Sequence, residues 1–381
     1  MARMGIGIIG CGNIAATYLR NAALFGDVDL IACADRVPEM AERRAGEFGL
    51  RAMGVDALLA EPAIDLVLNL TIPAAHREVT QAALAAGKHV FTEKPLGVTL
   101  REGRELVAEA ERRGLRLGSA PDTFLGAAGR RARALIDKGA IGRPVLGTAF
   151  MMGRGMEHWH PNPQFYYQPG GGPVLDMGPY YLTTLVNLLG PVVRVSAVAR
   201  TGEAERLITA EGPFRNTRFP VGTPTSLLSL LEFAGGAVVT FGASWDVFRH
   251  SNHPIELHGT EGSLRLPDPD TFGGDVALSP RGEPWAEHPS EPEPFGAINW
   301  PFDAPRLANY RMLGVADLVR SIREDREARA SGRLALHVLE VMEAILTAGE
   351  TGSAVSIEGA VERPAALGED EATALLSSDA A

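Results

Sequence analysis

The chain of 381 residues is poor in cysteine, lacks long uncharged runs and carries less positive than negative charge. Its two cysteines, Cys11 and Cys33, lie in apolar, strand-like runs, which favours reduced core thiols over a disulfide framework or a zinc site. No uncharged segment approaches the roughly 20 residues that a membrane-spanning helix needs. The net charge of −11 argues against nucleic acid or an anionic membrane as a general partner, although it does not exclude a local positive pocket.

The rest of the composition is that of an ordinary globular protein with a sizeable core, because 45% of the residues are hydrophobic and 22% are charged. A length of 381 residues predicts two or three domains. The first residues, MARMGIGIIG, lead straight into a strand-and-glycine pattern, without the charged and then apolar segments of a secretion signal. We therefore expect a cytoplasmic protein.

A glycine-rich turn follows the first apolar run. The pattern is G-x-G-x-x-A over residues 10–15, between the expected strand GIGIIG and the expected helix AATYLRNAALF. Gly10 permits a tight turn, Gly12 lets a pyrophosphate approach the backbone, and Ala15 allows helix and strand to pack closely. The expected cofactor contacts in this turn are Gly10, Gly12, Asn13 and Ile14.

The second expected strand, DLIACAD, ends in Asp35. An acidic residue at this distance from the glycines is the expected ligand of the adenosine ribose hydroxyls, and it repels a 2′-phosphate. Arg36 follows directly, and two roles stay open for it: stacking on the adenine or binding a 2′-phosphate. The carboxylate of Asp35 favours NAD as the cofactor, with NADP as the alternative.

Strand-like and helix-like segments alternate through residues 1–123, which predicts a doubly wound parallel sheet. The expected strands are GIGIIG (5–10), DLIACAD (29–35), DLVLNL (65–70), KHVFTEK (88–94) and LRLGSA (115–120). In such sheets ligands bind at the carboxyl ends of the strands. Thr71, Ile72 and Pro73 fall at such an end and are expected cofactor contacts.

The segment FTEKPLG places Glu93 and Lys94 at the end of a buried strand, directly before Pro95. Taken alone, these residues could simply mark the end of the strand, because proline stops strands and charged side chains favour solvent. The position of the segment at the cofactor edge favours a catalytic role for Lys94 instead, with Glu93 beside the cofactor. Two interpretations stay open for His76, which lies in the first turn of the next helix: a residue facing the cofactor or a structural histidine.

From about residue 124 the pattern changes to one helix followed by consecutive strand-like runs. These runs are PVLGTAFMMG (144–153), VVRVSAVAR (192–200), LLSLLEFAGG (227–236), AVVTFGASW (237–245) and IELHGTEGSLRL (255–266). The pattern predicts an α+β domain over residues 124–362, built on a large, mostly antiparallel sheet. One face of such a sheet needs covering, which favours a homodimer or homotetramer. We also expect a proline-rich loop over 282–296, two closing helices, and a loose tail over 363–381.

The segment GGGPVLDMGPYYLTTLVNLLG contains the expected substrate side of the site. Gly178 and Pro179 predict the entry of a helix, with Asp176 at its mouth. The helix then presents a polar stripe of Tyr180, Thr183, Thr184 and Asn187. The stripe has no Lys or Glu, so it suits a pocket that hydrogen-bonds hydroxyl groups better than it suits a solvated face.

His158 and Trp159 lie in the polar and aromatic loop before these glycines. As a metal site the loop is weak, because two histidines have no clear third ligand, and we expect no metal. Two interpretations remain: ordinary loop residues, or sugar contacts in which Trp159 offers a flat apolar face.

Four segments together resemble the glucose–fructose oxidoreductase / inositol dehydrogenase / MocA family. They are GCGNIA with Asp35, TIP with His76, EKP, and GGGPVLDMG. The resemblance spans nearly the whole chain. It implies a two-domain, NAD(P)-dependent oxidoreductase that acts on sugars, cyclitols and related polyols, and a cis peptide bond before Pro95.

The same resemblance implies a catalytic set of Lys94 and Asp176, from the motifs E-K-P and D-x-G-x-H. The sequence departs from the family at the histidine position, which is Tyr180, and at a further aspartate position, which is Thr183. Oxidation of an alcohol needs a general base, and a tyrosine serves only if a neighbouring ammonium lowers its pKa. Either Tyr180 moves the proton with Lys94 as its electrostatic helper, or Lys94 moves it and Tyr180 orients the substrate.

The predicted function is hydride transfer between a nicotinamide and a secondary alcohol or ketone of a sugar, anhydrosugar or cyclitol. One alternative is a redox-neutral sugar-modifying enzyme that keeps its NAD bound. The other is a non-catalytic nucleotide-binding regulatory protein, which the missing histidine favours and the presence of Lys94 and Asp176 opposes.

Overall fold

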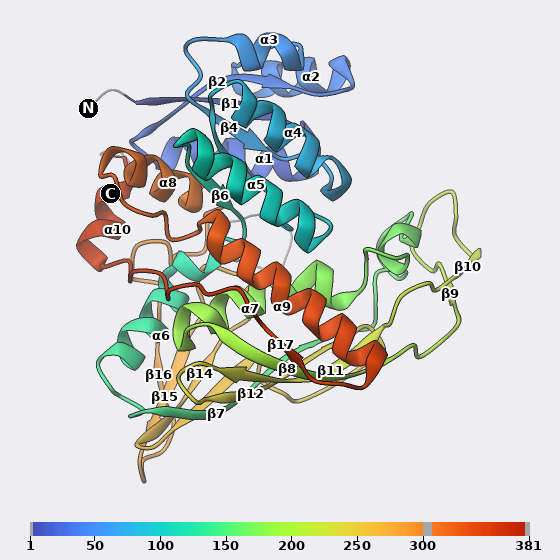
Figure 1. Ribbon diagram of the computed structural model, residues 1–381, viewed down its shortest axis with the longest axis vertical. Coiled ribbons are helices and arrows are strands. Elements are labelled where there is room, and N and C mark those ends of the chain that lie inside the picture. Colours follow the sequence, from blue (N-terminus) through green and yellow to red (C-terminus); the bar gives the residue numbers. More distant parts are fainter. Residues whose placement is uncertain (1–2, 300–306, 378–381) are drawn as a thin grey trace.

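The computed structural model describes residues 3–299 and 307–377. Figure 1 shows two layered halves: a smaller sheet flanked by helices, formed by the first third of the chain, and a larger sheet below it. The last described residues lie beside the first third of the chain, because the backbone N–H of Ser377 donates to the carbonyl oxygen of Leu24.

The smaller sheet is entirely parallel, with six strands in the order β3-β2-β1-β4-β5-β6. The strands are β1 (Met4–Ile9), β2 (Val28–Ala34), β3 (Arg51–Ala52), β4 (Leu66–Asn69), β5 (His89–Thr92) and β6 (Leu117–Ser119). The helices between them are α1 (Asn13–Asn21), α2 (Pro38–Phe48), α3 (Val55–Ala60), α4 (Pro73–Ala85) and α5 (Leu100–Arg113). The prediction of a doubly wound sheet is confirmed; the two-residue β3 and helix α3 were not foreseen.

The larger sheet has nine strands in the order β16-β15-β14-β13-β7-β12-β11-β8-β17. They are β7 (Pro144–Met152), β8 (Val192–Arg200), β11 (Ser226–Phe233), β12 (Val238–Ser244), β13 (Ile255–Gly259), β14 (Gly262–Leu266), β15 (Val276–Pro280), β16 (Ala286–His288) and β17 (Val355–Ser356). Only β7 and β12 pair in parallel, so the mostly antiparallel sheet is confirmed. A short ribbon of β9 (Glu205–Leu207) and β10 (Arg218–Pro220) projects beside it. β16 lies inside the segment expected to be a loop.

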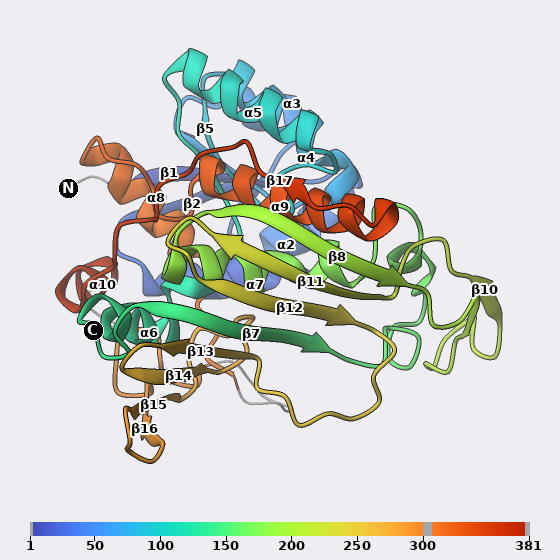
Figure 2. The same cartoon turned by 60° about the horizontal axis from the view of Figure 1, so that its bottom comes forward.

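Helices cover one face of the larger sheet and leave the other open, as Figure 2 shows for β7, β12, β11 and β8. The covering helices include α7 (Pro173–Leu189), which packs on β7 and β12, and α9 (Gly332–Thr351), which packs on β8 and β11. Strand residues alternate in burial, so the open face carries apolar side chains that are about half exposed. They include Leu146, Val198, Leu228 and Leu230, at 54%, 55%, 55% and 49% exposure.

Helix α7 begins earlier than the sequence predicted. Pro173 takes its first position, where a missing N–H costs nothing, and Pro179 lies inside the helix. Asp176 is therefore in the first turn of α7 rather than before it. An internal proline removes one backbone hydrogen bond, which a helix buried along most of its length tolerates through its packing.

The prediction of a loose tail from residue 363 is wrong for the described residues. Helix α10 (Glu369–Leu375) packs against α8 (Leu313–Arg323), and Leu375 is 3% exposed. The alanine-rich composition gave no sign of these packing contacts, which hold α10 against α8. The domain boundary at residues 123 and 124 stays a prediction, because α8 and α9 also contact β6. Among the helices that the structure describes, none combines the length and hydropathy needed to cross a bilayer.

Candidate active site

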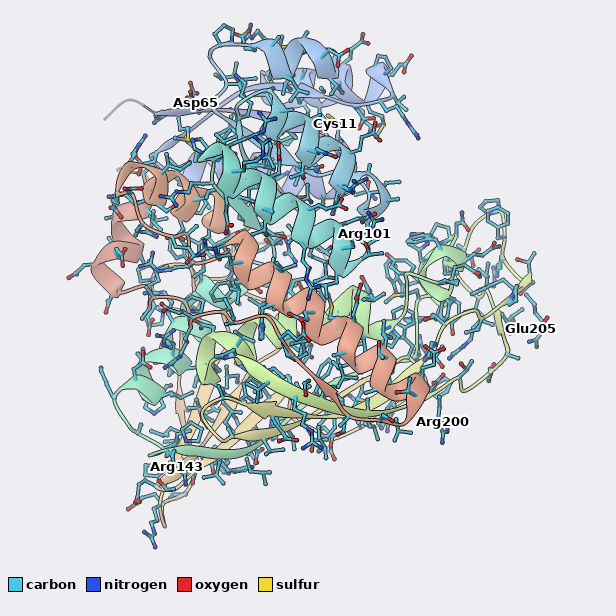
Figure 3. The ribbon with its side chains drawn as sticks, in the orientation of Figure 1. Cys11, Asp65, Arg101, Arg143, Arg200 and Glu205 are labelled. Atoms are coloured by element: carbon cyan, nitrogen blue, oxygen red, sulfur yellow. The ribbon has the colours of Figure 1, made fainter. Side chains whose placement is uncertain are left out.

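The glycine turn leaves room for a ligand at the N-terminus of α1. Gly10 has φ +103°, and a Cβ there would lie 2.5 Å from the carbonyl carbon of Leu70, so only glycine fits. A Cβ on Gly12 would meet no atom within 4 Å, which leaves open space above the turn that contains Cys11 (Figure 3). Asn13 and Ile14 open α1, whose first turn contains no acidic side chain. A pyrophosphate therefore fits both the space and the positive end of the helix dipole.

Asp35 lies at the end of β2 and is tied to the same turn. Its Oδ2 accepts a hydrogen bond from the backbone N–H of Cys11 at 2.7 Å, and its Oδ1 accepts from Val37 at 2.9 Å. Arg36 is exposed, whereas Arg44, which the sequence did not single out, donates to the carbonyl oxygen of Gly12 at 3.1 Å. The residues expected to hold an adenosine ribose and a pyrophosphate are thus side by side, and their chemistry fits NAD.

Two loops at the carboxyl edge of the sheet are joined by His76. Its ring nitrogens lie 2.7 Å from the carbonyl oxygen of Pro95 and 3.0 Å from that of Thr71. Each nitrogen thus lies against a backbone carbonyl oxygen and the ring is fully buried, which supports the structural interpretation of His76 over direct cofactor contact. Ile72, which precedes Pro73 at the start of α4, presents its side chain to solvent at 66% exposure.

Lys94 projects from the end of β5 toward helix α7. Its Nζ donates to the carbonyl oxygen of Asp176 at 2.6 Å and to the Oδ1 of the same residue at 3.1 Å. The peptide bond between Lys94 and Pro95 is cis, as the resemblance implied. Glu93 braces the strand end, because its carboxylate accepts from the backbone N–H of Lys94 at 3.0 Å and from the Tyr18 hydroxyl at 2.8 Å.

Tyr180 lies next to Lys94, as the proposed chemistry requires, but in an unexpected orientation. The Lys94 Nζ is 5.2 Å from the centroid of the tyrosine ring, so the ammonium faces the ring rather than the hydroxyl. The hydroxyl instead accepts from Arg311 Nη2 at 3.3 Å, and the same nitrogen binds Asp270 Oδ1 at 2.7 Å. Sequence reasoning missed Arg311 and Asp270, since neither belongs to a local motif.

The electrostatics of the pair differ from the expectation. Burial raises the pKa of the Tyr180 hydroxyl, and Asp270 adds to the rise; Lys94 and Arg311 lower it but do not prevail. Burial works to lower the pKa of the Lys94 ammonium, but interactions with Tyr180, Asp176 and Glu93 outweigh burial, so the pKa rises. Lys94 therefore lowers the pKa of Tyr180, as a neighbouring ammonium should, but burial of the phenol outweighs this effect.

A cavity of about 120 Å³ lies directly against Lys94 and Asp176. Its lining is Pro73, Lys94, Pro95, Gly97, Val98, Phe165, Tyr166, Gly170, Gly171, Leu175 and Asp176. Phe165 and Tyr166 pack together with ring centroids 4.1 Å apart. They supply the aromatic surface that the sequence analysis assigned to Trp159. The sequence signal that could have identified them is their position close to the glycines Gly170 and Gly171. Trp159 is 55% exposed and reaches this pair only through the ring of His160.

The other expected substrate contacts are not brought to this cavity. Thr184 lines a separate small cavity near Asp268, and its buried hydroxyl has no hydrogen-bond partner among the described residues. Thr183 is buried in α7, and Asn187 accepts a hydrogen bond from Arg133. His158 is half-buried and does not line the cavity. Within residues 3–299 and 307–377 there is no cluster of three or more His, Cys, Asp or Glu side chains that suits a metal ion.

Two family models match the chain over most of its length. Residues 4–120 match the oxidoreductase family with an NAD-binding Rossmann fold, and residues 130–265 match the GFO/IDH/MocA C-terminal domain. Among curated relatives, a dTDP-3,4-didehydro-2,6-dideoxy-alpha-D-glucose 3-reductase of Streptomyces antibioticus is 31% identical, over 69% of this chain and 75% of the relative. A 1,5-anhydro-D-fructose reductase of Ensifer adhaerens is 28% identical, over 68% and 74%.

A solved structure has the same fold over nearly all of both chains. It is an NAD binding oxidoreductase from Klebsiella pneumoniae, with a TM-score of 0.81 and 25% identity, covering 94% of this chain and 99% of the other. Together with the glycine turn, Asp35 and the paired Lys94 and Asp176, these matches leave no doubt about the family. The chain belongs to the GFO/IDH/MocA family of NAD-binding oxidoreductases.

Proposed function

We propose that the protein transfers a hydride between NAD and a secondary alcohol or ketone of a sugar or anhydrosugar. The observation that supports this most is the Lys94 ammonium, held by Asp176 on the wall of the 120 Å³ cavity at the carboxyl edge of the parallel sheet. That edge is where a nicotinamide lies when the pyrophosphate occupies the glycine turn. The relatives whose names mention a deoxysugar and an anhydrosugar support the substrate class.

The cofactor, when bound, supplies the hydride acceptor or donor, and the chain supplies orientation and the proton. Gly10, Gly12, Asn13 and Ile14 would hold the pyrophosphate, and Asp35 the adenosine ribose. The carboxylate of Asp35 opposes a 2′-phosphate by charge repulsion, which is the reason to prefer NAD over NADP.

Lys94 is the proposed proton carrier. It lines the cavity, whereas the Tyr180 hydroxyl is directed to Arg311. The raised pKa of Lys94 keeps it protonated at neutral pH, which is the form that donates a proton to a ketone oxygen as the hydride arrives. Asp176 holds the ammonium in place, and the Tyr180 ring, one turn further along α7, also faces it. In alcohol oxidation only the deprotonated amine of Lys94 could accept the proton, and the raised pKa disfavours that form.

Phe165 and Tyr166 are the proposed platform for the substrate ring. Sugar and anhydrosugar rings have apolar C–H faces that pack on aromatic side chains, while their hydroxyls need polar partners. Tyr166, Lys94 and Asp176 meet both needs around one cavity.

A homodimer or homotetramer in the cytoplasm is the proposed assembly and location. What supports the assembly is the open face of the larger sheet, where Leu146, Val198, Leu228 and Leu230 are about half exposed (Figure 2). A second copy covering this face would remove those side chains from water.

The test is a panel of sugars, anhydrosugars and cyclitols, each assayed with NAD and NADP and, for ketone forms, with NADH and NADPH. The expected result is a net change in reduced nicotinamide with at least one sugar or anhydrosugar, and faster turnover with NAD than with NADP. Conversion of a sugar without any net change in nicotinamide would replace the proposal with the redox-neutral alternative. Preference for NADP would overturn the role of Asp35.

A further inference from the structure

A second cavity, of about 310 Å³, lies far from the proposed hydride site. It is bounded by helix α6 (Ala127–Asp137), the C-terminal part of α7 and the segment that leads into α10. Residues of α6 and Glu369 of α10 line the same cavity, and Figure 2 shows the two helices close together. Asp176 and Asn187 lie at opposite ends of α7, so the rise of the helix alone separates the two cavities by roughly 16 Å.

The lining of this cavity is rich in positive charge, in a chain whose net charge is −11. The charged residues around it are Arg130, Arg131, Arg133, Lys138, Glu293 and Glu369. One carboxylate serves two guanidinium groups, because Glu293 Oε1 lies 2.5 Å from Arg131 Nε and its Oε2 lies 3.4 Å from Arg130 Nη2. Positively charged side chains therefore outnumber negatively charged ones around this cavity. The negative net charge of the chain had left room for such a local positive pocket.

Two of the basic side chains have unused binding capacity. Arg130 is only 7% exposed, and its Nε has no hydrogen-bond partner in the part of the chain that the structure describes. Burial lowers the pKa of Arg130, while the carboxylates of Glu293 and Glu369 oppose this effect. Lys138, at the end of α6, is exposed and forms no ion pair with a described residue. A bound anion would satisfy both groups.

Arg133 is already held in place for such a role. Its Nε binds Asp137 Oδ2 at 2.7 Å, and its Nη1 donates to Asn187 Oδ1 at 3.1 Å and to the carbonyl oxygen of Pro364 at 2.8 Å. Guanidinium groups fixed by such contacts lose little side-chain entropy when a ligand binds.

We propose that this cavity binds a small phosphate-bearing molecule, with its phosphate between Arg130, Arg131 and Lys138. Planar guanidinium groups match the paired oxygens of a phosphate, and several of them together suit its double negative charge. Phe124, Leu125 and Leu135 form an apolar wall that accommodates an organic part. The volume of about 310 Å³ limits that part to the size of a monosaccharide or smaller.

The experiment measures binding by calorimetry to the full chain saturated with NAD, so that the glycine turn is already occupied. The probes are inorganic phosphate, a hexose monophosphate and citrate, at matched ionic strength. We expect saturable binding of the phosphate probes. If the hexose monophosphate binds more tightly than inorganic phosphate, the ligand is an organic phosphate. If the two bind equally, the ligand is free phosphate; both results support the site. Tighter binding of citrate, or no binding, would overturn it.

Variants locate the binding. Lys138→Gln removes an exposed charge that has no partner to lose, so it leaves the fold intact, and we expect binding to weaken by roughly tenfold. The double variant R131Q/K138Q should weaken it further. The matched control R112Q/R113Q removes the same charge from the outer surface of α5 and should leave binding unchanged. Equal weakening in the control and in R131Q/K138Q would show general charge screening and would overturn the site.

Discussion

The two halves of the protein contribute to the proposed active site in different ways. In the first half, each site residue follows the end of a parallel strand, so neighbours in the sequence are neighbours in the site, as Glu93 and Lys94 are. In the second half, the contributors come from separate elements: Tyr166 lies in a short 3₁₀ helix (Gln164–Tyr167), Asp176 in α7, and Arg311 much later in the sequence, before α8. The cofactor side is thus built locally, and the substrate side depends on long-range packing.

This difference predicts that variants in the two halves separate cofactor binding from turnover. The largest effect is expected at Lys94, where the cofactor side of the site meets the substrate side. Lys94→Ala should lower kcat by roughly 10²–10⁴-fold, because it removes the proton carrier, while the Kd for NADH changes by less than about threefold. Stopped-flow turnover and fluorescence titration with NADH measure the two quantities.

Tyr180→Phe is the matched control for Lys94→Ala, because it keeps the ring below the ammonium and removes only the hydroxyl bound to Arg311. A loss of less than about tenfold in kcat is expected. If Tyr180→Phe costs as much as Lys94→Ala, then the phenol carries the proton and the proposed role of Lys94 is wrong.

The next effect concerns the seam between the halves, where Asp122 accepts a hydrogen bond from the backbone N–H of Gly314 at 2.8 Å. Burial raises the pKa of Asp122 from 3.8 to about 6. A raised carboxyl pKa means that the folded state holds the proton more tightly, so this group costs stability as pH rises from about 4 to about 6. Asp122→Asn, which is neutral throughout, should be more stable than wild type by up to about 3 kcal/mol above that window and equal to it below.

Urea unfolding at about pH 4 and about pH 7 measures this difference. Asp29→Asn is the control, because Asp29 is exposed on β2, and it should give the same stability difference at both pH values. A stability difference for Asp122→Asn that does not change with pH would show that Asp122 is ionised in the folded protein throughout this range.

On the cofactor side, Asp35→Asn should raise the Kd for NADH by roughly 10-fold and bring the Kd for NADPH closer to it. The amide keeps an oxygen for the N–H of Cys11 but loses the charge that excludes a 2′-phosphate. Asp65→Asn is the control, since Asp65 precedes β4 at the opposite edge of the sheet (Figure 3). Unchanged selectivity in Asp35→Asn would mean that another group, such as Arg44, sets the cofactor preference.

The smallest effect is expected on the substrate side. Tyr166→Ala should raise the KM for the sugar by roughly fivefold without changing the Kd for NADH, because it removes part of the aromatic surface of the cavity. Trp159→Ala, which alters an exposed ring outside the cavity, should change the KM by less than about twofold. The opposite ranking would restore Trp159 as the sugar contact.

Much of the fold was predictable from local patterns. The alternation in residues 1–123 led to the parallel sheet, and the glycine pattern with Asp35 led to the cofactor edge. Strand-like runs with glycine turns led to the larger sheet. A predicted helix boundary was wrong where proline can occupy two kinds of position. Pro179 was expected to start the helix, but Pro173 holds the first position and Pro179 lies inside α7. Likewise, the alanine-rich tail contains the packed helix α10.

The sequence by itself therefore determined most of the elements and the cofactor turn, and it singled out Lys94 and Asp176 as site residues, because each depends on spacing within a short segment or on family motifs. Only the tertiary structure decided that the Tyr180 hydroxyl faces Arg311, that Phe165 and Tyr166 line the cavity, and that four basic side chains surround a second one. Each arrangement brings together residues from different elements, such as Tyr180 and Arg311, which are 131 positions apart. Burial then raises the pKa of the Tyr180 hydroxyl. No periodicity or motif records that packing, since it arises only when the two sheets and their helices are assembled.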